Sequence, residues 1–169
     1  MLNRRGFTLV ETVISIAIMA LVIVNVLGVF AIGNNAIKKS KSIVTATNVA
    51  EKKIAEIKNF CTTYKDYNVD ITDTDISDNI SGNNITINPV PPFKLWQSPP
   101  APMTATSIYG IEKIDNVGDF KFEIEINDYI DSSLITVYDI KKVMVTVKWI
   151  DPPSMEEKKS SIITLIAKE

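Results

Sequence analysis

The chain has 169 residues, a formal net charge of −2 and 46% hydrophobic residues, which suits one modest domain with a long additional element. The near-neutral charge gives no support for nucleic-acid binding. With one cysteine, Cys61, and no histidine, an intramolecular disulfide, a Cys/His metal cluster and a histidine-based triad are excluded, so we expect no enzyme activity, metal site or cofactor.

The first residues, MLNRRG, form a short basic segment directly before an apolar run. No charged residue occurs from Thr12 through Ile37, and about 20 apolar residues are enough to cross the hydrocarbon core as a helix. The run therefore predicts a transmembrane helix. Gly28 and Gly33 are its predicted points of flexibility, since each costs about 1 kcal/mol relative to alanine in an ordinary helix.

Beyond Ile37 the pattern becomes amphipathic. Apolar or small residues recur every three or four positions, with Lys52, Lys53, Glu56 and Lys58 between them, and they are Ile43, Thr47, Ala50, Ile54, Ile57 and Cys61. No proline interrupts the chain from Phe7 to Cys61. We expect one long helix, with a membrane half at 7–37 and an amphipathic half at 38–61 that packs on a soluble domain.

Residues 62–106 show no clear periodicity and contain six of the eight prolines, so they predict a long irregular connection with a short strand near Ile85 to Ile87. The acidic part of this connection is an alternative calcium site, formed by Asp70, Asp73, Asp75 and Asp78. The EF-hand spacing fails because Asp78 stands where that loop needs glycine, so a solvated acidic loop is the favoured interpretation.

The last segment, 107–169, alternates between apolar and polar residues. Phe120, Phe122, Ile124 and Ile126 interleave with charged residues, and Val143, Val145, Val147 and Trp149 repeat the pattern. The chain turns near Asp151 and returns through Ile163, Leu165 and Ala167. Leu134 to Tyr138 adds a strand or extends the next one. An antiparallel sheet is predicted, with an apolar face that covers the helix.

At Gly6-Phe7-Thr8-Leu9-Val10-Glu11 the sequence resembles the processing site of type IV prepilins and type II secretion pseudopilins. The resemblance comprises a basic leader that ends in glycine, a following phenylalanine, an acidic residue four positions on, and an apolar helix. KKVMVTVKW at 141–149 and ATNVAEKKIAEIK at 46–58 are similar to segments of minor pilins and pseudopilins.

The resemblance implies that 1–6 is a leader removed by a prepilin peptidase after Gly6, that the new amine of Phe7 is methylated, and that Glu11 is the carboxylate used in assembly. The basic residues that flank the apolar run do not decide its orientation in the membrane. The resemblance implies that the N-terminus lies inside the cell. Gly28, where major pilins often have proline, and the missing cysteine pair favour a minor or specialised subunit.

Other interpretations of the N-terminal segment stay open. A secretory signal would be cleaved near Ala31-Ile32-Gly33, but the run is long for a signal and Glu11 stands at its entrance. A plain single-pass anchor explains the length and leaves Gly6, Phe7 and Glu11 without a role. Cys61, which has no histidine partner, is interpreted as a small buried apolar residue.

We therefore expect a pilin-like α+β fold: a long N-terminal helix on a C-terminal antiparallel sheet of about four strands. The expected function is assembly with other pilin or pseudopilin subunits into a type IV pilus or a related secretion or DNA-uptake pseudopilus, after residence in membrane lipid. The alternative function is that of a membrane-anchored extracytoplasmic binding domain that does not polymerise.

Overall fold

A computed structural model describes residues 8–66, 69–88, 90–96, 105–131, 133, 135–151 and 154–168. The chain divides into two compact units, Met1–Ser40 and Lys41–Glu169. One helix, α1 (Leu9–Thr63), contributes its N-terminal part to the first unit and the rest to the second. The single long helix expected from the sequence is therefore confirmed.

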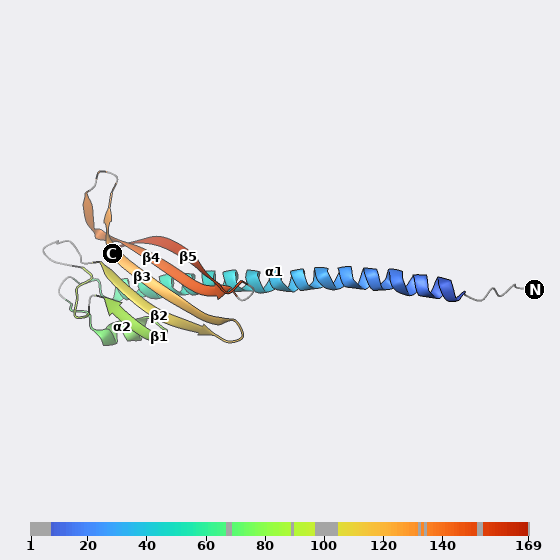
Figure 1. Ribbon diagram of the computed structural model, residues 1–169. Coiled ribbons are helices and arrows are strands. Elements are labelled where there is room, and N and C mark those ends of the chain that lie inside the picture. The colour runs from blue at the N-terminus through green and yellow to red at the C-terminus, as the bar shows by residue number, and fades with distance from the viewer. Residues whose placement is uncertain are drawn as a thin grey trace, which may run out of the picture. The chain divides into compact units, whose positions relative to one another are not determined.

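The second unit contains a five-stranded antiparallel sheet in the order β1-β2-β3-β4-β5. Each strand pairs with the one before it in the chain, as Figure 1 shows, with the C-terminal part of α1 behind the sheet. The strands are β1 (Asn83–Asn88), β2 (Thr106–Ile114), β3 (Gly118–Ile130), β4 (Thr136–Asp151) and β5 (Glu156–Ala167). The α+β fold is confirmed, with one strand more than the four or so expected.

The strand that the alternating pattern did not predict is β2. Its centre is Gly110, which usually weakens a strand because it has no side chain to pack. Gly110 pairs with Phe122 of β3, and a Cβ at Gly110 would overlap the Phe122 ring. The ring therefore occupies the space that a side chain at Gly110 would fill, and the strand keeps its packing.

The connection at 62–106 is less irregular than expected, because it contains both β1 and a short helix, α2 (Asp73–Asn79). The helix begins with a capping box: the Thr72 side chain accepts from the N–H of Asp75, and the Asp75 carboxylate accepts from the N–H of Thr72. Ile76 of α2 is wholly buried. The predicted strand near Ile85 to Ile87 is confirmed as part of β1.

The apolar face of the sheet forms the core with α1. Phe122, Ile124, Val145 and Val147 have almost no exposed surface, as the alternation predicted. The expectation for β5 was wrong about which residues face the core. Val145 pairs with Ile162, and paired residues share a face of the sheet, so Ile163 and Leu165 lie on the other face and are 55% and 50% exposed. The segment near Leu134 to Tyr138 extends β4, which begins at Thr136; Leu134 itself lies outside the described residues.

The buried stripe of α1 is rotated from the one that the sequence predicted. Ala50, Ile57 and Cys61 are buried as expected, but Ile43 is 45% exposed. The remaining buried residues of the stripe are Ser42, Ala46, Val49, Lys53 and Phe60. Our assignment of Lys53 to the polar face was therefore wrong, and the reason is the set of acceptors that surrounds its ammonium group.

Lys53 is fully buried and links three parts of the second unit. Its Nζ lies 2.9 Å from Oε2 of Glu56 and 3.1 Å from Oε2 of Glu112 on β2, and it donates to the carbonyl of Ser81. The same ammonium group lies 4.5 Å from the centroid of the Phe122 ring. A buried charge is tolerated only when it is paired and hydrogen-bonded, and these contacts meet that requirement.

A second buried ion pair lies near the last turn of α1. Lys141 of β4, 2% exposed, contacts the carboxylate of Asp128 on β3 and lies 5.0 Å from the centroid of the Trp96 ring. The indole N–H of Trp96 donates to the carbonyl of Cys61 over 3.5 Å. These contacts connect the segment before residue 97 to both the sheet and the helix.

Candidate functional site

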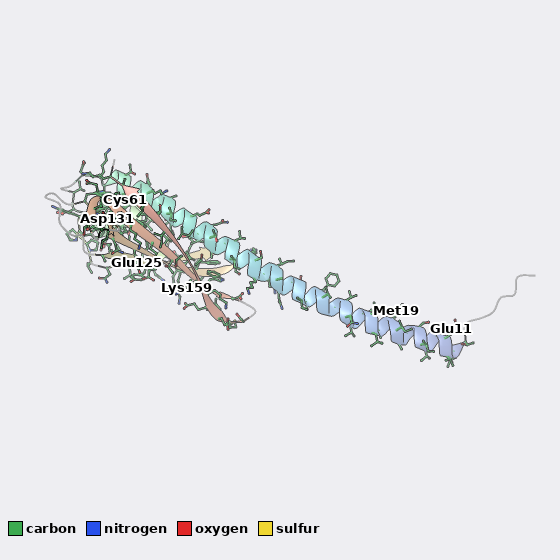
Figure 2. The ribbon with its side chains drawn as sticks, turned by 90° about the horizontal axis from the view of Figure 1, so that it is seen from above. Glu11, Met19, Cys61, Glu125, Asp131 and Lys159 are labelled. Atoms are coloured by element: carbon green, nitrogen blue, oxygen red, sulfur yellow. The ribbon has the colours of Figure 1, made fainter. Side chains whose placement is uncertain are left out.

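Thr8 accepts hydrogen bonds from two N–H groups in the first turn of α1. The N–H of Glu11 donates to Oγ1 of Thr8 over 3.2 Å, and the N–H of Thr12 donates to the carbonyl of Thr8 over 3.1 Å. This places Glu11 in the first turn, where a carboxylate interacts favourably with the helix dipole. The Glu11 side chain is exposed and stands out from the helix (Figure 2). Gly6 and Phe7, the predicted cleavage site, lie outside the described residues.

The rest of the first unit offers an apolar surface. Every side chain from Leu9 to Ser40 is exposed, and an 18-residue window of α1 has a mean hydropathy of 2.8. Within the described residues, α1 is the one helix long and apolar enough to cross a membrane. Exposed apolar surface on this scale is unfavourable in water, so the segment requires lipid or the helices of other proteins around it.

The helix is unbroken at both Gly28 and Gly33. A Cβ at either position would meet nothing within 4 Å, apart from the backbone of the neighbouring turns. The two glycines differ in their surroundings, because Gly33 lies in a groove of about 480 Å³. Its lining residues are Val26, Val29, Phe30, Gly33, Asn34 and Ile37. The flexibility expected at Gly28 and Gly33 stays a prediction.

In the acidic segment, the Asp75 carboxylate accepts hydrogen bonds from groups of the same chain. Oδ2 of Asp75 accepts from the N–H of Thr72 over 2.7 Å, and Oδ1 accepts from the Tyr64 hydroxyl over 2.7 Å. These donors lower the pKa of Asp75, the Thr72 N–H most strongly, and the hydrogen bond to Asp75 raises the pKa of Tyr64. No cluster of three potential ligands for a metal ion is found in the described part of the chain.

Cys61 is buried, at 2% exposure, in the last turns of α1 (Figure 2). Burial raises the pKa of its thiol to about 12, although the nearby charge of Lys141 acts in the opposite direction. A thiol that stays protonated near neutral pH is a poor nucleophile. The interpretation of Cys61 as a buried apolar residue is confirmed.

Comparison with protein families identifies residues 1–24 as the prokaryotic N-terminal methylation motif, the hallmark of type IV prepilin-like proteins. The resemblance stated from Gly6, Phe7 and Glu11 is thereby confirmed at the level of this class. No curated protein and no solved structure matches the chain. The motif and the apolar helix together support a type IV pilin-like protein that is made as a membrane-anchored precursor and processed at its N-terminus.

Proposed function

We propose that this chain is a structural subunit, minor in abundance, of a type IV pilus or a related pseudopilus. The observation that carries the proposal is the methylation motif at residues 1–24, which overlaps the start of a helix that has Glu11 in its first turn and an exposed apolar surface. A prepilin peptidase cleaves after Gly6 and methylates the amine of Phe7. The second unit lies on the extracytoplasmic side, and the apolar part of α1 resides in lipid until assembly.

Glu11 provides the selection step of assembly. A charge at the centre of a membrane helix costs about 2.5 to 3.5 kcal/mol, and less near the interface, so an isolated carboxylate here favours a partner. Cleavage after Gly6 creates a positive amine on Phe7. Within one helix the backbone fixes the position of that amine, whereas the Phe7 amine of a neighbouring subunit is free to approach Glu11. The pair therefore forms only between subunits.

The experiment replaces Glu11 by valine and measures how much of the chain enters sheared surface filaments. Glu11→Val is expected to leave cleavage and membrane insertion intact and to reduce incorporation strongly. Glu51, an exposed glutamate of α1 in the second unit, provides the matched control, and Glu51→Val is expected to assemble normally. Wild-type incorporation of the Glu11 variant would show that this carboxylate does not direct assembly.

Gly28 contributes flexibility in this proposal, because a filament requires its subunit helices to bend or unwind locally. We expect Gly28→Leu to be tolerated in the membrane precursor and to enter filaments poorly. A variant that enters filaments as well as the wild type would leave Gly28 without this role. A chain that is anchored but absent from all filaments would instead favour the non-polymerising binding domain.

A further inference from the structure

Asn25 is a polar residue in the middle of the apolar part of α1. At about 1.5 Å per residue it lies roughly 21 Å along the helix from Glu11 and roughly 18 Å from Ile37, the last residue before the lysines. Both ends of the uncharged run are therefore too far away for its amide to reach water or headgroups. Asn34 and Asn35, in contrast, lie close to Lys38 and Lys39.

The amide of Asn25 differs from the hydroxyls of Thr12 and Ser15, the polar groups that precede it in this run, in having no partner. The hydroxyl of Ser15 donates to the carbonyl of Glu11 over 2.8 Å, and that of Thr12 donates to the carbonyl of Thr8 over 3.3 Å. Among the residues described from Thr8 to Ser40, no such bond is found for the exposed Asn25 side chain. In hydrocarbon an unsatisfied amide is unfavourable, so a neighbouring molecule has to supply the partner.

The position of Asn25 around the helix indicates which molecule that is. At about 100° per residue, Glu11, Asn25, Val29 and Gly33 fall within a sector of about 80°. The groove around Gly33 only borders this sector: it includes Val29 and Gly33, but its other lining residues lie about 60° to 140° from Glu11 around the helix, away from Asn25. A small residue such as Gly33 lets another helix approach closely, and an amide fixes its register by a hydrogen bond. The side of α1 that carries Glu11 thus also carries a polar residue, Asn25, and a glycine, Gly33.

We propose that Asn25 donates and accepts hydrogen bonds across the contact with the apolar membrane helix of a neighbouring pilin-like subunit, which packs on the face formed by Glu11, Asn25, Val29 and Gly33. This inference rests on the proposed function, and it adds a second polar contact deep in the apolar segment. Glu11 selects a neighbour at the end of the helix, and Asn25 sets the register along it.

The first test reads the contact in membranes. A photocrosslinking amino acid is placed at Val29, on the proposed face, or at Leu27, which lies about 160° from Glu11 around the helix. Adducts between the full-length chain and another pilin-like chain are expected from Val29 and only weakly from Leu27. Equal yields from both positions, or adducts from Val29 with lipid alone, would overturn the proposal.

The second test measures incorporation into sheared filaments. Asn25→Leu is expected to reduce incorporation roughly threefold, the size typical of a polar contact between membrane helices, and Asn25→Gln to reduce it less. The matched control combines Asn25→Leu with Leu27→Asn, which keeps the composition and moves the amide to the opposite side. This double variant should incorporate as poorly as Asn25→Leu, and wild-type incorporation of either would overturn the proposal.

The two tests separate this inference from the proposed function. If the wild-type chain itself is absent from filaments, the proposed assembly function fails. The crosslinking result from membranes still decides whether the face formed by Glu11, Asn25, Val29 and Gly33 contacts another pilin-like helix.

Discussion

Lys53 on α1 and Glu112 on β2 form an ion pair between helix and sheet, with 3.1 Å between Nζ and Oε2. The Lys53 side chain has no exposed surface, and that of Glu112 is 13% exposed. Lys52 approaches the other oxygen of Glu112 at 2.7 Å, but its side chain is 49% exposed. Two adjacent lysines thus contact one carboxylate from very different environments, and their substitution separates a buried pair from a surface pair.

Lys53→Ala is expected to destabilise the second unit by about 3 to 5 kcal/mol, because it removes the fully buried ammonium group that Glu56 and Glu112 share and leaves only Lys52, which is half exposed, beside these partly buried carboxylates. Lys52→Ala should cost less than about 1 kcal/mol, as is typical of exposed pairs. Urea unfolding of the full chain in detergent micelles measures both. Equal losses would contradict the distinction between the two lysines.

Acid should weaken the same connection. Burial alone would raise the pKa of Glu112, but hydrogen bonds from Lys52 and Lys53 and their charges outweigh it, so the pKa lies below 4.5. Since the folded state lowers this pKa, the stabilisation is present above pH 4.5 and is lost as pH falls through the lower folded value. Unfolding followed from about pH 6 to about pH 3 should show this loss, and Glu112→Gln should make it smaller. Asp119→Asn, at an exposed carboxylate, is the matched control variant.

Gly110→Ala is expected to destabilise the sheet by about 1 to 3 kcal/mol, because the added methyl group overlaps the Phe122 ring. In the Phe122→Leu background, Gly110→Ala should cost less stability than it does in the wild type, because the smaller side chain leaves room for the added methyl group. A double-mutant cycle of unfolding free energies measures this coupling. Additive losses would show that the ring and the glycine do not share this space.

The thiol of Cys61 should be unreactive while the second unit is folded, because it is buried and its pKa is raised to about 12. Maleimide labelling at about pH 8 is expected to be at least about tenfold slower in the native protein than after unfolding in urea. Lys53→Ala, which weakens the packing of α1, should accelerate labelling of the native form. Rapid labelling of the native wild type would contradict the burial of Cys61.

Parts of the fold with strong periodicity were predictable. The long apolar run and the absence of proline predicted α1, and strict alternation around Phe122 and Val145 predicted β3 and β4. The pattern was misleading where one contact between distant residues decides the structure. Gly110 alone argues against a strand, but the Phe122 ring fills the space beside it. Lys53 alone resembles a surface residue, but its ion pair with Glu112 allows it to be buried. Such contacts arise from tertiary packing, which local spacing does not encode.

Two other features have a local signal in the sequence. Thr72 followed three residues later by Asp75 resembles a capping box, and it marks the start of α2. Asn25 is a polar residue within a run of apolar ones, which in a membrane helix indicates a contact. The motif at Gly6, Phe7 and Glu11 was recognisable because its chemistry lies in adjacent residues and needs no folded context.

Mass spectrometry of the N-terminal peptide from sheared filaments tests the central claim most directly. If the chain is a processed pilin-like subunit, the filaments should contain it, and its first residue should be Phe7 with a methyl group on the amine. An N-terminus at Met1, an N-terminus near Asn34 as an ordinary signal peptide would leave, or the absence of the chain from filaments that contain other pilins would contradict the account.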